Sequence, residues 1–391
     1  ARLEVFEVLP QQHLRLLEDV LRRRVPRHQA VDIKRERALV LGQQFKKGCG
    51  GIIHHPARVA VGAVLDRKNS QSSRARGFPH EGESGFCSQW GAGLWMPMLR
   101  AWLELARISN LPTVWTNVSA GWLLAGGGWD ARLGWLLLAG SLLYTGGMIL
   151  NDAADVKFDR EHRPERAIPS GRVSAAAAWA VGAGMLAAGA GMAVAQGGAC
   201  PWIAAGLVAS VILYDLFHKP WSGAVWVMGS CRLLLVLLAA SANDTGCKMS
   251  GEMLATPHGI ALGVYIVGLT KVARLESSKE GAVVLSLVMA KLLLWVPAIL
   301  AVAFTFWVAV DAEPSDWLPL LMLPVFAIWV FLSMRIMRKG GPHVGRAVGW
   351  LLAGIPIVDA LAVGHVSLTL ACGFAALAPL LRLWQRWIAA T

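Results

Sequence analysis

The chain has 391 residues, of which 55% are hydrophobic and 16% are charged. Soluble domains carry about 25% charged residues, so this composition excludes an ordinary soluble protein and indicates one that lies largely in a bilayer. The formal net charge of +12 does not indicate nucleic-acid binding, because membrane proteins collect Lys and Arg in their cytoplasmic loops. The six cysteines are scattered, so we expect neither a zinc site nor a disulfide framework.

Residues 1–95 differ from the rest of the chain. They are rich in Arg and His, contain runs such as LRRRVPRHQ, and lack an apolar stretch long enough to cross a bilayer. The first methionines, Met96 and Met98, lie directly before the membrane pattern. We interpret residues 1–95 as a basic N-terminal extension, either upstream of the natural start or a genuine arm that lies on anionic lipid or on a neighbouring protein. Residues 96–391 form the expected transmembrane domain.

The rest of the chain consists of apolar segments, each close to the roughly 20 residues that a 30 Å hydrocarbon core requires. In chain order we expect them near residues 109–128, 132–151, 175–196, 201–217, 223–242, 258–273, 281–309, 317–334, 347–363 and 366–381. The last two are either two helices or one broken helix around Gly364 and His365. The predicted fold class is an all-α membrane bundle of about nine to ten transmembrane helices with a central cavity.

Loop charge predicts the orientation. Residues 152–174 and 335–346 hold clusters of Lys and Arg, whereas residues 243–257 and 310–316 are mainly acidic. Under the positive-inside rule, the first pair of loops is cytoplasmic. We expect an integral protein of the bacterial inner (plasma) membrane. Within it, the small residues of GAGMLAAGAG (182–191) favour close helix packing.

The stretch NDAADVKFDREHRPERAIPSGRVS, residues 151–174, follows the second apolar segment. If that helix runs on past Asn151, three carboxylates share one face with the Asn151 amide, namely Asp152, Asp155 and Asp159. Hard oxygen ligands at this density indicate Mg²⁺, which proteins hold through a few carboxylates together with substrate phosphates. Five basic residues of the same loop would bind those phosphates: Lys157, Arg160, Arg163, Arg166 and Arg172. The alternative is a hydrophilic loop in which Asp and Arg only pair with each other.

This stretch resembles the first signature of the UbiA superfamily of membrane prenyltransferases, N-D-x-x-D-x-x-x-D followed by Arg and an R-P-x-x-S-G-R-like tail. The motif matches at Asn151, Asp152, Asp155, Asp159 and Arg160, and the tail at Arg163, Pro164, Arg166, Pro169, Ser170, Gly171 and Arg172. The resemblance covers residues 104–391. Arg107 and Asn110 in ARISNLPTVWTN are similar to the family's opening, and Tyr214 and Lys219 in LYDLFHKP match its tyrosine and lysine. The resemblance implies that these side chains bind or act on the diphosphate.

The second signature of the family, a D-x-x-x-D-like motif, is altered here. The chain has LTKVARLESSKEG, in which Glu276 and Glu280 keep the spacing but replace the aspartates. The two glutamates could hold a second Mg²⁺, with Lys271 and Arg274 on the phosphates, or they could be solvated loop charges. In this region the chain is similar to UbiA-like proteins of bacterial Ebo gene clusters.

The resemblance implies Mg²⁺-dependent transfer of a prenyl group from an isoprenoid diphosphate to a lipophilic acceptor, with Asp155, Asp159, Tyr214 and Lys219 as catalytic candidates. An impaired prenyl-lipid binding or scaffold protein of the same fold is the alternative, and a transporter is a further one. Lys291 and Asp359 fall inside expected spans, where ionisable groups are costly. They either line the acceptor cavity or pair with each other.

Overall fold

The computed structural model describes residues 92–219, 221–243, 255–275, 283–308, 314–338 and 343–385. Within these ranges all regular structure is helical and no strand forms. The expected N-terminal extension lies outside the described residues except for 92–95, so it stays a prediction. A helix from Ala92 to Leu105 crosses its expected boundary.

The helices follow one another with short connections. The first part of the domain contains α3 (Ala92–Leu105), η1 (Ile108–Asn110), α4 (Leu111–Leu124), α5 (Ala131–Ala154), α6 (Val156–His162), α7 (Ala175–Ala195), α8 (Pro201–Phe217) and α9 (Ala224–Ser241). The second part contains α10 (Ala255–Leu275), α11 (Val283–Val308), η3 (Pro314–Leu321), α12 (Met322–Met337), α13 (His343–Ala353), α14 (Ile355–Val363) and α15 (Leu368–Trp384).

Six described segments are long and apolar enough to cross a membrane: Ala131–Ala154, Ala175–Ala195, Ala224–Ser241, Leu287–Trp307, Trp317–Met337 and His343–Val363. The helices α8 and α15 are apolar but shorter. Large apolar side chains such as Trp202, Phe306 and Ile328 are exposed, as expected of surfaces that face lipid. The domain is therefore an integral membrane bundle, although the expected count of nine to ten spans is not confirmed.

Two expected segments have different ends in the structure. The first does not begin at residue 109 as one long helix, because Arg107 adopts a left-handed conformation (φ 44°, ψ 49°) between α3 and η1. The second runs past Asn151 to Ala154, but Asp155 (φ −82°, ψ −2°) then separates α5 from α6. The segments near 347–363 and 366–381 are separate helices joined by a turn, and Gly354 divides the former into α13 and α14.

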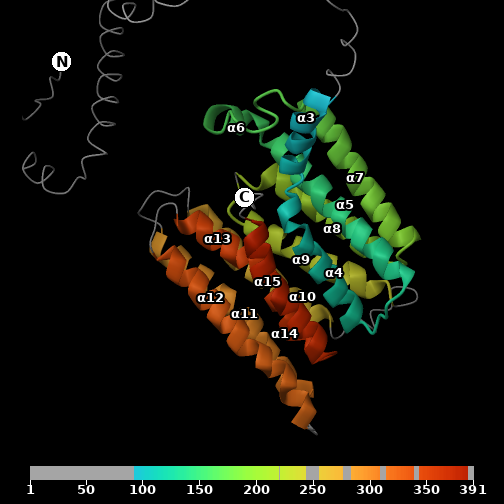
Figure 1. The fold of residues 1–391 in the computed structure, drawn as a ribbon, viewed down its shortest axis with the longest axis vertical. Coiled ribbons are helices and arrows are strands. Elements are labelled where there is room, and N and C mark those ends of the chain that lie inside the picture. Colours follow the sequence, from blue (N-terminus) through green and yellow to red (C-terminus); the bar gives the residue numbers. More distant parts are fainter. Residues whose placement is uncertain are drawn as a thin grey trace, which may run out of the picture. The chain divides into compact units, whose positions relative to one another are not determined.

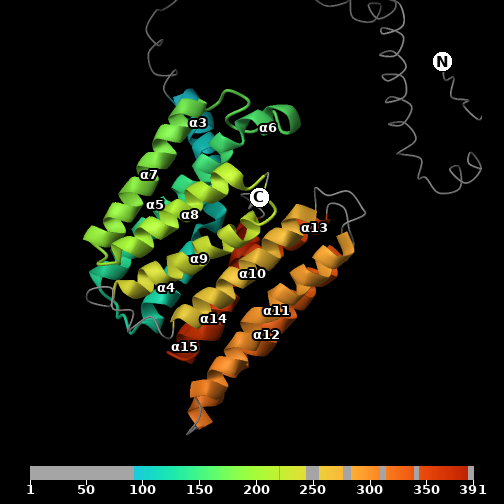
Figure 2. The ribbon, with the colours of Figure 1, turned by 180° about the vertical axis from the view of Figure 1, so that it is seen from behind.

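The helices are packed as two groups that meet at α4 and α9. One buried apolar cluster joins α4, α5, α7, α8 and α9, and another extends from α9 through α10 to α15. Figures 1 and 2 show α5, α7 and α8 on one side and α10, α11 and α12 on the other. The expected close packing of small residues occurs between α5 and α7, where a Cβ atom on Gly146 would lie 2.8 Å from the Gly182 carbonyl oxygen.

The cysteines correct one expectation. Cys200, at the start of α8, takes part in a disulfide bond, whereas Cys231 and Cys372 are free. Scattered positions in the sequence did not reveal this pairing, because a disulfide depends on proximity in the fold.

Candidate functional site

The candidate site lies at the end of the bundle where α5 and α8 finish and α4 begins, which we call the carboxylate end. Arg107 precedes α4, and its Nη2 atom lies 3.3 Å from Asp152 Oδ1 at the end of α5. A left-handed backbone conformation is unfavourable for a residue with a Cβ atom, so the surrounding structure must hold Arg107 in place. The ion pair with Asp152 is one contact that does so.

Arg166 binds two of the predicted carboxylates. Its Nη1 atom lies 3.3 Å from Asp152 Oδ1 and 2.9 Å from Asp159 Oδ2. Both aspartates are buried, and Asp159 is only 2% exposed. Although α6 is separate from α5, Asp152 and Asp159 therefore still contact the same side chain, Arg166. This Asp–Arg pairing is the arrangement that the alternative of a hydrophilic loop predicts.

Asp155 points to a different set of cations. The Lys219 Nζ atom lies 2.7 Å from Asp155 Oδ1, and the His218 Nε2 atom lies 3.4 Å from Asp155 Oδ2. Burial alone would raise the pKa of Asp155, but its hydrogen bonds to His218 and Lys219 outweigh burial and hold this pKa below its usual value. Burial would likewise lower the pKa of His218, and the bond to Asp155 raises it instead. The predicted Lys219 therefore reaches the first motif directly.

Tyr214 and Asp215 lie one turn before Lys219. The Tyr214 ring stacks on His218 with 5.1 Å between ring centroids. Asp215 is buried and accepts a 3.1 Å hydrogen bond from Asn151 Nδ2, while its Oδ2 atom has no hydrogen-bond partner among the described residues. Neither Asp215 nor His218 was predicted from the sequence. A carboxylate beside Tyr214 inside an apolar segment is the signal that could have found the first of them.

The remaining predicted residues lie in several environments. Asn110 is buried at the end of η1, and Arg274 donates to the carbonyl oxygens of His218 and Ser222 next to Lys219. Lys271 is half-buried on α10. Exposed positions on α6 and the loop after it are occupied by Lys157, Arg160 and Arg163. Glu276 and Glu280 lie outside the described residues, so their role stays a prediction.

The carboxylate end offers oxygen donors of the type that Mg²⁺ prefers. They are Asn151, Asp152, Asp155 and Asp159, and the Oδ2 atom of Asp215 is a further buried oxygen without a donor among the described residues. Across the described ranges no three His, Cys, Asp or Glu side chains converge on one point. Arg166 and Lys219 contact the carboxylates instead. The donor set fits Mg²⁺ in its chemistry, and in this structure protein cations pair with it.

A pocket of about 80 Å³ extends from this end into the bundle between α5, α8 and α9. Tyr214 and Asp215 line it together with apolar residues such as Leu143, Leu207 and Val211. Arg232 lines the pocket deeper in the bundle, so the wall combines apolar side chains with a few polar groups, as is usual for a ligand-binding pocket.

Deeper in the bundle, four polar side chains from four helices form a network in which Asn117, His258 and Asp359 are buried and Arg232 is half-buried. Arg232 on α9 donates to Asn117 on α4, which donates to Asp359 on α14, and His258 on α10 contacts Asp359 through a 3.0 Å bond. No ion pair joins Asp359 to Lys291 in the part of the chain described, so the alternative in which these two groups pair with each other is wrong. Arg232 was not predicted either, although it is a charge inside the expected 223–242 segment.

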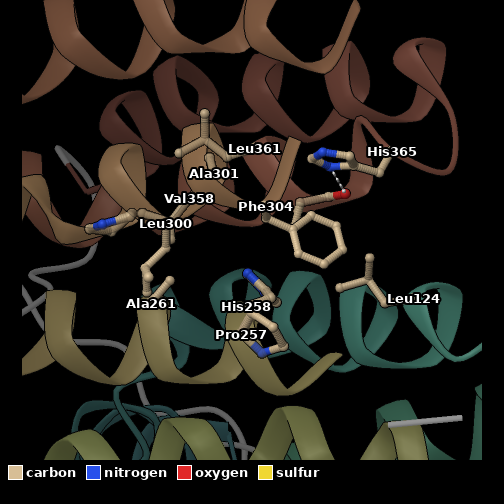
Figure 3. A pocket seen from close by; sticks show the side chains of 12 residues that line it. Leu124, Pro257, His258, Ala261, Leu300, Ala301, Phe304, Val358, Leu361 and His365 are labelled. Carbon is tan, nitrogen blue, oxygen red and sulfur yellow. Dashed lines mark hydrogen bonds between the residues drawn. The ribbon is translucent and has the colours of Figure 1, made fainter. Parts of the chain in front are cut away.

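A second cavity of about 30 Å³ lies between α10, α11 and α14. Figure 3 shows His258 and His365 on opposite walls of this cavity, with the Phe304 ring between them. The cavity has room for about one water molecule, so a prenyl chain does not fit it.

Comparison with known proteins gives a family match. Residues 112–353 match the model of the UbiA prenyltransferase family. Among curated proteins, the digeranylgeranylglyceryl phosphate synthase of Methanopyrus kandleri is 38% identical over 142 residues, which cover 34% of this chain and 52% of that protein. The synthase of the same name from Ignicoccus hospitalis is 39% identical over 93 residues, which cover 23% and 30%. The chain thus spans about half the length of the first relative and less of the second.

A solved structure of a digeranylgeranylglyceryl phosphate synthase in membranes has a related architecture. The TM-score is 0.50 with 19% sequence identity, and the match covers 69% of this chain and 99% of that one. At this identity the likeness shows the fold alone.

Proposed function

Because the chain belongs to the UbiA prenyltransferase family, we propose that residues 96–391 form a membrane enzyme that transfers a prenyl group from an isoprenoid diphosphate to an acceptor. The contact of Lys219 with Asp155 carries this proposal. It places a cation from the end of α8 on the acidic motif at the end of α5. Acidic and basic groups close together suit a site for a metal-bound diphosphate.

The residues have distinct roles in this proposal. Asn151, Asp152, Asp155 and Asp159 would hold Mg²⁺, with Glu276 and Glu280 as predicted further ligands. When bound, the metal would neutralise charge on the diphosphate and so help it to leave. The nearby basic groups donate hydrogen bonds to phosphate oxygens, and Lys219, Arg166 and Arg107 are the best placed of them.

The transfer breaks the bond between prenyl C1 and the diphosphate oxygen, and pyrophosphate leaves with the electron pair. A bond then forms between C1 and an acceptor nucleophile, and an acceptor hydroxyl would release its proton. The mainly apolar pocket between α5, α8 and α9 reaches Tyr214 and Asp215, where it would exclude water from the electrophilic carbon. By analogy with the similar synthases, we propose a prenylated glyceryl phosphate with a free hydroxyl as the acceptor class.

We also propose that the carboxylate end faces the cytoplasm of a plasma membrane. The basic loop 152–174 supports this orientation through the positive-inside rule. The disulfide bond at Cys200 supports it as well. Cys200 precedes the start of α8 and Lys219 follows its end, so in this proposal the two residues lie on opposite sides of the membrane. Disulfides persist in oxidising compartments outside the cytosol. The orientation can be tested by introducing a cysteine at Lys157 or at Trp202 and treating intact cells with a membrane-impermeant thiol reagent. The cysteine at position 202 should react, and reaction of the cysteine at position 157 would contradict the proposal.

One observation favours a second candidate, a prenyl-lipid binding or scaffold protein. Arg166 forms ion pairs with both Asp152 and Asp159, and a catalytic metal would need these two carboxylates. The resemblance to the Ebo-cluster proteins points the same way, but it depends on Glu276 and Glu280, which the structure does not describe.

Pyrophosphate release separates the two candidates. Purified protein in lipid nanodiscs would receive Mg²⁺, prenyl diphosphates of several lengths and pooled acceptors, with EDTA as the control. Release that EDTA and Asp155→Asn abolish, and that Glu161→Gln on the exposed side of α6 leaves intact, is the result expected of an enzyme. Mg²⁺-dependent binding of prenyl diphosphate without release would favour the binding protein.

A further inference from the structure

Arg232 is a charged side chain in the middle of an apolar membrane helix. Its Nη1 atom donates to Asn117 Oδ1 at 2.6 Å, and its Nη2 atom donates to Thr113 Oγ1 at 3.4 Å. No carboxylate lies within 4.0 Å of the guanidinium among the described residues, and its other N–H groups have no partner there. Arg232 is half-buried, and a charged group inside a membrane span is costly, so such a group usually has a function.

The same guanidinium lines the pocket that leads from the carboxylate end. Its Cζ atom lies 5.5 Å from the centroid of the Tyr144 ring on α5. Tyr144 precedes Asp152 by eight residues on that helix, which corresponds to an axial distance of about 12 Å. Arg232 therefore lies about two helical turns below the proposed diphosphate site, where a second substrate could reach both.

Three buried residues hold Arg232 in this position. Asn117 Nδ2 donates to Asp359 Oδ1 at 3.0 Å and to Oδ2 at 2.8 Å, which leaves Asn117 Oδ1 to face Arg232. His258 Nε2 contacts the same carboxylate, and both Asn117 and Asp359 are fully buried. Because Asp359 is separated from the guanidinium by the Asn117 side chain, its negative charge compensates Arg232 only in part.

We propose that Arg232 binds an anionic group of the acceptor, a phosphate monoester or a carboxylate, and that Asn117 and Asp359 are positioning residues for it. This inference rests on the proposed function, which supplies the need for an acceptor. A fixed cation in the pocket opposes the positive charge that develops on the prenyl C1 atom. An anion on the acceptor removes that opposition and forms charge-assisted hydrogen bonds with the N–H groups that lack partners.

Equilibrium binding tests the proposal without turnover. The probes are a glyceryl phosphate with one geranylgeranyl ether, the same lipid with a hydroxyl in place of the phosphate, and a benzoate with its neutral benzamide. Wild-type protein in nanodiscs should bind at least one anionic probe about 10-fold to 100-fold more tightly than its neutral counterpart. Arg232→Gln should abolish this preference and Arg232→Lys should retain part of it. Equal binding of every charged and neutral pair by wild-type protein would overturn the proposal.

The positioning roles have their own readout. Asn117→Ala should weaken binding of the preferred anionic probe, and combination with Arg232→Gln should add little, because both changes remove one interaction. Mg²⁺-dependent binding of prenyl diphosphate should be unchanged in each variant, which also shows that the protein is folded. Equal loss of donor and acceptor binding would show that the network is only structural. Absence of pyrophosphate release would refute the proposed enzyme but leave the result for anion binding intact.

Discussion

The Lys219 Nζ atom lies 2.7 Å from Asp155 Oδ1, although the whole of α7 and α8 separates the two residues in the sequence. The same Nζ atom lies 4.0 Å from the centroid of the Phe158 ring on α6. One ammonium group thus connects the end of α8 with the junction of α5 and α6. In the proposed reaction Asp155 would hold Mg²⁺, and Lys219 would donate to a phosphate oxygen of the diphosphate.

The first prediction concerns this ammonium group. Lys219→Met should lower kcat/KM for the prenyl diphosphate about 100-fold, because a cation that stabilises the leaving pyrophosphate is lost. Pyrophosphate release at varied donor concentration measures the effect. The control is Arg338→Met, which removes an exposed cation at the end of α12 and should change little. Equal losses in the two variants would indicate a general effect of charge rather than a role in the site.

The second prediction concerns the guanidinium that Asp152 and Asp159 share. In EDTA, Arg166→Gln should reduce the free energy of unfolding by about 3 to 5 kcal/mol, since it leaves buried carboxylates without this partner. Mg²⁺ should restore part of the loss if the aspartates bind the metal, and melting temperatures with and without Mg²⁺ would show it. Arg160→Gln on exposed α6 should cost no more than about 0.5 kcal/mol. A loss that Mg²⁺ leaves unchanged would argue against these metal ligands.

The third prediction concerns pH and His365, which lies in the turn between α14 and α15. Burial lowers the pKa of His365 despite hydrogen bonds to backbone carbonyl oxygens that raise it. The unfolded chain therefore binds a proton more readily than the folded chain. The stability that this group contributes is fully present above the unfolded pKa of about 6.5, and it is lost as the pH falls from there through the folded pKa.

Melting temperatures between pH 7.5 and pH 5 would test this direction. Relative to the wild-type protein, His365→Gln should be less destabilised by acidification, because it lacks a group that binds a proton more readily in the unfolded chain. His162→Gln changes an exposed histidine on α6 and should follow the wild type. If the melting temperature of His365→Gln depends on pH as strongly as that of the wild type, groups other than His365 cause the dependence.

The first motif could be read from the sequence because its information is local. Spacing along one helix predicted the grouping of Asp152 with Asp159, and Arg166 contacts both. The end of α5 at Asp155 could not be predicted from local spacing. It depends on where α6 packs, and its consequence is that Asp155 faces Lys219 and His218 instead of Arg166.

Residues that meet only through the tertiary fold were missed. Arg232 is a single charge in an apolar segment, and nothing in its neighbourhood of the sequence indicates Asn117 or Asp359 as partners. Asp359 was noticed as an intramembrane charge, but Lys291 was the wrong candidate for its partner. Four helices must be packed before the network exists, so spacing within one segment carries no information about it.

The last prediction concerns the packing of α9 against α10. A Cβ atom on Gly229 would lie 2.6 Å from the Gly263 carbonyl oxygen, which is too close for any side chain without movement of the helices. Gly229→Ala should therefore reduce the free energy of unfolding by about 1 to 3 kcal/mol. Because α9 carries Arg232 and contacts the pocket, acceptor binding should weaken as well.

Gly184→Ala on α7 is the matched control, since nothing lies within 4 Å of its added Cβ atom. That change should be neutral or stabilise the helix by up to about 1 kcal/mol. Unfolding in a mixed-detergent series would compare the two variants, and equal stability would mean that α9 and α10 do not need the close approach at Gly229.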